Sequence, residues 1–304
     1  QVDGAITGSS TINGVGISSN ITNFANSILI SNDAGTGTLD AATKNTGLGW
    51  EVFDDITTAD GNTGLGYQAL TALTTAPFNT ALGRSSLATT TIGDGRNTAV
   101  GYQSLTALTT GNNNVGVGMN AGAAITTATK NVVVGSLSGD ALTEGAENVA
   151  IGYESLTTDT LGSHSVAVGP SALRTQNFTT ATSAMNTAVG SFAMYANTTG
   201  INNTAVGRSA LQVNTTGAEN VAVGTYSLDA NTTSDGSTAI GYAALSTNSG
   251  ANNTAVGRRA LDANTTGIDN VALGANALDS NTTANDNVAI GRYALQAVTT
   301  SADN

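Results

Sequence analysis

The chain has 304 residues, of which 10% are charged and 4% aromatic, and its formal net charge is −12. Too few large side chains are present for a thick globular core, so the composition favours a thin, extended fold. The negative charge repels phosphate backbones, which argues against nucleic acid as a partner. No apolar run approaches the roughly 18 residues of a membrane helix, which argues against membrane insertion. The absence of cysteine excludes disulfides and thiolate metal sites.

The first part of the chain, residues 1–44, is the least regular. Within it, Asn26-Ser27-Ile28-Leu29-Ile30 has the form of a degenerate repeat with Asn26 in first place. We therefore expect an irregular N-terminal segment over 1–44, followed by a regular domain over 45–304.

Residues 45–304 repeat one motif, Asn-x-Ala-Val-Gly. Its fifteen closing glycines are Gly49, Gly66, Gly83, Gly101, Gly118, Gly135, Gly152, Gly169, Gly190, Gly207, Gly224, Gly241, Gly257, Gly274 and Gly291. Successive glycines are 17 residues apart, except for one spacing each of 18, 21 and 16. Such a period indicates a solenoid, in which each repeat, here called a rung, buries its apolar side chains only against neighbouring rungs.

Two features concern the continuity of the repeat. The 21-residue spacing between Gly169 and Gly190 predicts a loop of four extra residues within 174–185. Asn304 lies 17 residues after Asn287, so we expect the repeat to continue beyond this segment.

Positions within a rung are numbered from its Asn. Position 2 is Thr or Val and position 4 is Val, Leu or Ile, an alternation that predicts a strand with positions 2 and 4 inward and the Ala or Gly of position 3 outward. Positions 8 and 9, usually Ala or Ser and then Leu, predict a second short strand with one inward anchor. Asn-Thr-Thr-Gly is typical of turns. The Asn side chains at position 1 should form a ladder between rungs. The predicted fold is all-β, a parallel β-solenoid or β-roll of about fifteen rungs.

The expected core of each rung is small, with apolar side chains at positions 2, 4 and 9. Ordering the backbone costs roughly 1–2 kcal/mol per residue, so a single chain should be only marginally stable. The small residues at positions 3 and 8 would let another backbone approach closely. We therefore expect a homotrimeric fibre; the alternative is a monomeric solenoid with exposed small residues.

The units Asn203-Thr-Ala-Val-Gly207 and Asn148-Val-Ala-Ile-Gly152 resemble the Asn-Ser-Val-Ala-Ile-Gly repeats of trimeric autotransporter adhesin heads. With Asn214-Thr-Thr-Gly217 between units, the sequence is still more similar to repeats in phage tail-fibre proteins and related bacterial surface proteins. The resemblance covers about 45–304. It implies a left-handed parallel β-roll wound as a trimer in an extracellular fibre.

Position 6 carries aromatic and arginine side chains in most rungs, as recognition surfaces often do. The candidate recognition stripe consists of Trp50, Tyr67, Arg84, Tyr102, Tyr153, Arg208, Tyr242, Arg258 and Arg292. The alternative interpretation is that these side chains cover the rim between chains or shield the rung edges.

The Asn-Thr-Thr turns create a series of glycosylation sequons. The candidate acceptors are Asn197, Asn214, Asn231, Asn264 and Asn281, with further sequons at Asn20, Asn177, Asn202 and Asn252. A chain rich in Asn and Thr also produces sequons by chance, and a bacterial or phage source usually leaves them unmodified.

Catalytic chemistry has little support in the sequence. The single histidine, His164, lies in a predicted turn, and no nucleophile and acid are set apart to form a triad with it. The acidic residues lack the Gly-Gly-x-Gly-x-Asp spacing of calcium-binding β-rolls. No basic residue or helix follows Gly64-Leu-Gly66 to hold a phosphate. We expect no enzyme, no metal and no cofactor.

The sequence thus predicts a structural and adhesive fibre shaft or head, extracellular and part of a phage tail fibre. Its partners would be further copies of itself and cell-surface glycans or receptors. The first alternative is a bacterial adhesin or surface filament of the same fold. A minor alternative is an ice-binding solenoid that uses its paired threonines.

Overall fold

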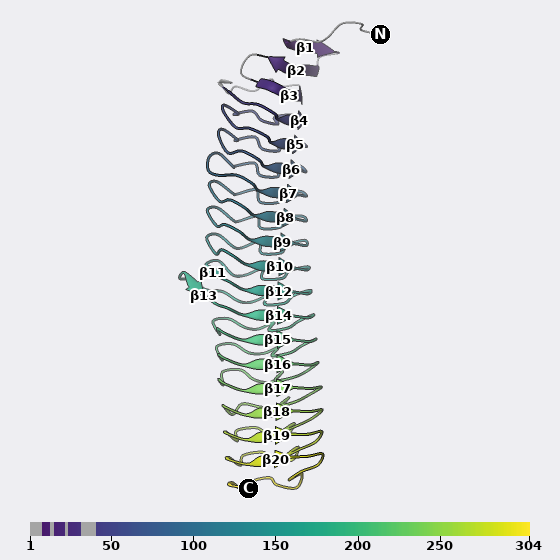
Figure 1. The fold of residues 1–304 in the computed structure, drawn as a ribbon, viewed down its shortest axis with the longest axis vertical. Coiled ribbons are helices and arrows are strands. Elements are labelled where there is room, and N and C mark those ends of the chain that lie inside the picture. The colour runs from purple at the N-terminus through teal and green to yellow at the C-terminus, as the bar shows by residue number, and fades with distance from the viewer. Residues whose placement is uncertain (1–7, 13–14, 22–23, 32–40) are drawn as a thin grey trace. The chain divides into compact units, whose positions relative to one another are not determined.

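The computed structural model describes residues 8–12, 15–21, 24–31 and 41–304, with side chains described at 27–31 and 41–304. The chain divides into two compact units, Gln1–Glu147 and Asn148–Asn304, and each is considered by itself. The described residues form twenty strands and no helix (Figure 1).

The first unit begins with an antiparallel meander of β1 (Gly8–Ile12), β2 (Val15–Ile21) and β3 (Phe24–Ser31). From β3 onward, each strand pairs in parallel with the next. These strands are β4 (Thr46–Leu48), β5 (Thr63–Leu65), β6 (Thr80–Leu82), β7 (Thr98–Val100), β8 (Val115–Val117) and β9 (Val132–Val134).

The second unit repeats the same parallel pairing. Its strands are β10 (Val149–Ile151), β12 (Val166–Val168), β14 (Thr187–Val189), β15 (Thr204–Val206), β16 (Val221–Val223), β17 (Thr238–Ile240), β18 (Thr254–Val256), β19 (Val271–Leu273) and β20 (Val288–Ile290). Every pair places position 2 beside position 2 and position 4 beside position 4. The predicted parallel β-solenoid of about fifteen rungs is confirmed.

The predicted extra loop is also present. Here β11 (Gly162–Ser163) pairs in parallel with β13 (Thr182–Ser183), and the two project beside the main stack (Figure 1). The additional residues lengthen one rung without changing the register of β12 against β14.

The degenerate repeat is shifted by one residue from the predicted alignment. Ile28 pairs with Thr46, so Ser27 and not Asn26 occupies position 1. The Ser27 hydroxyl accepts the backbone N–H of Asn45 at 2.8 Å, which is the role of an asparagine in the other rungs.

The predicted faces of the main strand are reversed. Position 3 is buried in the described strands, while positions 2 and 4 are exposed or half-buried. The interior is too narrow for more than a small side chain at position 3. A Cβ added to Gly116 would lie only 2.6 Å from the Ser104 hydroxyl oxygen and 2.7 Å from Cγ of Leu105. Because the small face is the inner one, it is not available for the chain-to-chain contact that the sequence suggested.

The second predicted strand does not form. Positions 6 to 11 are turns, in which positions 7 and 9 adopt left-handed backbone conformations such as φ 52° at Gln103 and φ 50° at Leu105. The inward anchor at position 9 is nevertheless confirmed, since Leu105 is fully buried. A left-handed residue costs roughly 1–2 kcal/mol, which burial of a leucine, worth about 1.5–3 kcal/mol, offsets.

The glycine at position 5 has a strict structural cause. Gly101 has φ 130°, and a Cβ there would lie 2.5 Å from the carbonyl oxygen of Gly118 in the next rung. Rungs therefore stack glycine on glycine at the end of each strand, where any side chain would separate them.

Candidate functional site

The asparagines of position 1 form the predicted ladder through the interior. Asn114 is fully buried, and its Nδ2 donates to the carbonyl of Ala128 in the same rung at 2.8 Å. Its Oδ1 accepts the backbone N–H of Asn131 in the next rung at 3.0 Å. The same pattern recurs in the second unit, where Asn203 bonds Gly217 and Asn220. Each asparagine thus closes its own rung and joins it to the next.

A second interior column, at position 12, has a different composition in the two units. In the first unit its buried members are Ile56, Leu73, Thr90, Leu108, Ile125 and Leu142. In the second unit they are Asp159, Gln176, Asn197, Asn214, Asn231, Asn248, Asn264 and Asn281. The sequence pattern contained this difference, because the Asn of each Asn-Thr-Thr turn stands where earlier rungs have Leu or Ile.

All five candidate glycosylation asparagines belong to this column. Each is fully buried, and Asn214 is typical, with its Nδ2 donating to Asn197 Oδ1 at 2.8 Å and to the Gly217 carbonyl at 3.0 Å. A glycan on such an amide would require its rung to open. The sequons at Asn202 and Asn252 are exposed, whereas the side chain of Asn20 lies outside the described residues.

Asp159 is a buried carboxylate that the sequence analysis did not single out. It accepts the backbone N–H groups of Gly162 at 3.1 Å and Phe178 at 3.0 Å, and Nε2 of Gln176 at 2.6 Å. Gln176 in turn bonds Ser165 and Asn186 of the position 1 ladder. These bonds link the two interior columns at the lengthened rung.

Four residues of the predicted recognition stripe come together in the first unit. Trp50 and Tyr67 meet edge to face with ring centroids 5.8 Å apart. The Arg84 guanidinium lies between two rings, 5.5 Å from the centroid of Tyr67 and 5.7 Å from that of Tyr102. The side chains stay accessible, with Trp50 51% and Tyr102 42% exposed. Arg84 occupies one face of each neighbouring tyrosine, so the stack also supports itself, by about 0.5–1 kcal/mol for each exposed pair.

The stripe is discontinuous in the second unit. Arg208 stacks on Tyr226, one position further along the next rung, and its Nη1 donates to the tyrosine hydroxyl at 2.8 Å. Tyr226 meets Tyr242 edge to face at 6.2 Å. Arg292 stacks on its neighbour Tyr293 at 4.5 Å. The remaining predicted members, Tyr153 and Arg258, are exposed.

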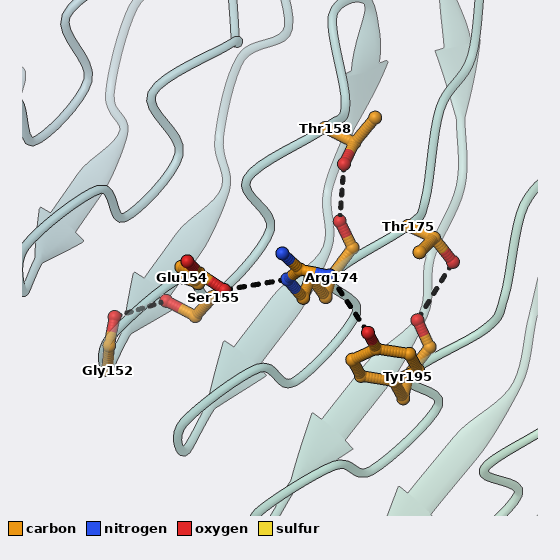
Figure 2. A network of polar contacts seen from close by, with 7 residues as sticks. All are labelled: Gly152, Glu154, Ser155, Thr158, Arg174, Thr175 and Tyr195. Carbon is orange, nitrogen blue, oxygen red and sulfur yellow. Dashed lines mark hydrogen bonds and ion pairs between the residues drawn. The ribbon is translucent and has the colours of Figure 1, made fainter.

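The lengthened rung carries a polar cluster that the stripe did not include (Figure 2). Nε of Arg174 donates to Glu154 at 2.7 Å, and its Nη1 donates to the Tyr195 hydroxyl at 2.8 Å (Figure 2). A hydrogen bond from Tyr153 and the contact with Arg174 lower the pKa of Glu154. The missed signal is position 10, where Arg174 and Tyr195 replace the small residues of other rungs.

The histidine lies where the sequence placed it, in a turn. His164 is exposed, and its Nδ1 lies 3.0 Å from the Ser183 hydroxyl. Among the described residues, no group of three or more His, Cys, Asp or Glu side chains is arranged to hold a metal ion.

The paired threonines are only partly free. The first threonine of a pair donates its hydroxyl to a carbonyl of the next rung, as Thr74 does to Thr91 at 2.6 Å and Thr198 to Thr215 at 2.9 Å. These hydroxyl protons are therefore used between rungs and do not form a free hydroxyl lattice.

Comparison with known proteins adds no identity to this geometry. No protein-family model, curated protein or solved structure matches the chain. The described residues also include no helix that is long and apolar enough to cross a membrane.

Proposed function

We propose that this chain is a non-enzymatic structural and adhesive segment of an extracellular fibre, in a phage tail fibre, assembled as a homotrimer. One observation carries the proposal: each rung is closed internally and bonded to the next, while the same side-chain chemistry recurs on its outside. Such an array adds surface contacts by adding rungs, and many weak contacts acting together bind a surface strongly.

The column that begins with Trp50, Tyr67, Arg84 and Tyr102 supports the adhesive part. Its rings and guanidinium are accessible and lie on consecutive rungs. Aromatic and arginine side chains dominate many binding surfaces, and ring edges together with an arginine suit the hydroxyl and carboxylate groups of cell-surface glycans.

A bacterial adhesin or surface filament is the alternative, because the same array would serve on a cell. Immunogold electron microscopy with antibodies against the chain separates the two locations. Labelling of tail fibres on phage particles released from the source cells supports the proposal. Labelling of the cell envelope alone would favour the adhesin.

The adhesive role is tested by binding of the labelled chain to whole cells and to a glycan array. The variant Y67A/Y102A/Y242A should lose at least tenfold in binding. A matched control is I92A/V213A/I268A, which truncates three side chains that are also 38–51% exposed but lie outside the stripe. Equal binding by the two triple variants would remove the stripe from the proposal.

A further inference from the structure

The outer face of the main strands carries no charge. Positions 2 and 4 of the strands β4 to β10, β12 and β14 to β20 contain only Thr, Val, Leu and Ile. Many of these aliphatic side chains are strongly exposed, among them Leu48 (48%), Leu65 (40%), Leu82 (43%), Ile151 (38%), Val206 (37%), Ile240 (41%) and Leu273 (45%). We call this surface, positions 2 and 4 of all rungs, the outer strand face.

This composition has no role in the fold of a single chain. The rung interior is filled by position 3 and by the leucines of position 9, with the asparagine ladder beside them. A sheet face that stays in water normally carries polar residues at alternate positions. A contiguous exposed apolar surface of several hundred Å² marks an interaction site.

The period of the face indicates which partner fits it. Its aliphatic columns repeat at every rung, about 4.8 Å apart. A globular partner would match a few rungs, whereas another copy of the chain repeats the same chemistry at the same interval. With a net charge of −12, two copies repel each other unless they meet at an uncharged surface.

The size of the face is also adequate. Three strand residues span about 10 Å, so each rung offers a footprint of about 50 Å² and all the rungs together about 700 Å². A stable protein interface buries about 800 Å² on each partner.

We propose that the outer strand face is the surface through which copies of this chain pack together. The inference rests on the proposed homo-assembly and assigns it to the face opposite the one that the sequence suggested. Thr and Val at position 2 and Val, Leu or Ile at position 4 of one copy pack against the same columns of the next. The small residues of position 3 remain inside each chain.

The test places like charges on this face in two adjacent rungs, as V206D/V223D. The matched control, T216D/T233D, adds the same charges to the same two rungs at exposed turn positions. Sedimentation equilibrium should give a multiple of the single-chain mass for the natural chain and the control. The face variant should dissociate at least 100-fold more readily.

A gentler variant, V206T/I240T/L273T, keeps β-branched residues on the strands and reduces only their apolar surface. It should also weaken association while retaining the β-sheet circular dichroism of the natural chain. A natural chain that sediments as a monomer, or a V206D/V223D mass equal to that of the control, overturns the proposal. Loss of glycan or cell binding without a change in mass would instead concern the adhesive function alone.

Discussion

Residues 41–147 and residues 148–304 use the same strand, the same position 1 ladder and the same glycine stacking, yet they fill the position 12 column differently. The first unit places aliphatic side chains there, as at Leu108, and the second places asparagines, as at Asn214. One backbone path therefore accepts either apolar packing or a hydrogen-bonded amide ladder.

The two solutions differ in how they respond to irregular rungs. An aliphatic side chain makes non-directional contacts, so it needs no particular partner above or below it. A buried amide needs an amide in register. At the 16-residue rung, Asn248 donates to Gly250, and Oδ1 of the preceding Asn231 is left buried without a hydrogen-bond partner. The amide ladder thus fixes register more strictly, at the cost of an unsatisfied group wherever the period changes.

The largest expected effect is one that does not distinguish the units. G101A and G207A each place a Cβ 2.5–2.6 Å from the next rung at φ 130° and 139°. Strain and overpacking together should lower the free energy of unfolding by about 4 kcal/mol in either unit. Urea denaturation followed by circular dichroism measures the loss. A cost below about 1 kcal/mol would mean that the rungs are not stacked glycine on glycine.

Exchanging the position 12 residues sharpens the comparison. L108N loses the burial of a leucine and places an amide between Thr90 and Ile125, where no ladder exists, so it should cost about 3 kcal/mol. N214L breaks the ladder but adds a buried aliphatic side chain, so it should cost only about 1–2 kcal/mol. Hydrogen exchange measured by mass spectrometry should locate each loss to the altered rung and its neighbours. Equal costs would show that the two columns are energetically equivalent.

Truncating the shared ladder should affect the two units equally. N114A removes the donor to Ala128 and the acceptor for the Asn131 N–H, and N203A removes the corresponding bonds to Gly217 and Asn220. Each should cost about 2–3 kcal/mol, because buried backbone groups lose their partners. The same urea series measures both variants, and a difference of more than about 1 kcal/mol between them would break the equivalence of the units.

The smallest effect concerns the cluster at the lengthened rung of the second unit. Because the folded-state pKa of Glu154 is lowered, its contribution to stability is present above the ordinary glutamate value and is lost as the pH falls through the folded-state pKa. E154Q should therefore lose at most about 1 kcal/mol at neutral pH and nothing in acid. Melting temperatures of both proteins across the acid range would show the curves converge; parallel curves would contradict this assignment.

Much of the fold could be predicted because the repeat itself carries the information. The 17-residue period predicted parallel stacking, the invariant Asn predicted the ladder, and the interval from Gly169 to Gly190 predicted the extra loop. The buried state of Asn197 and its relatives could also have been inferred, since they align with Leu73 and Leu108. The stacking of Arg84 between two tyrosines depends on side-chain conformations and could not.

The sequence by itself determined the period, the strand positions, the turn residues and the chemistry that each rung repeats. Only the tertiary structure decided which face of the strand is inside. Alternation of Val with Ala shows that two faces differ, but either could be buried. The choice depends on the space left by position 9 and the asparagine ladder once glycines of adjacent rungs touch. That space holds a methyl group, so the larger aliphatic side chains point outward.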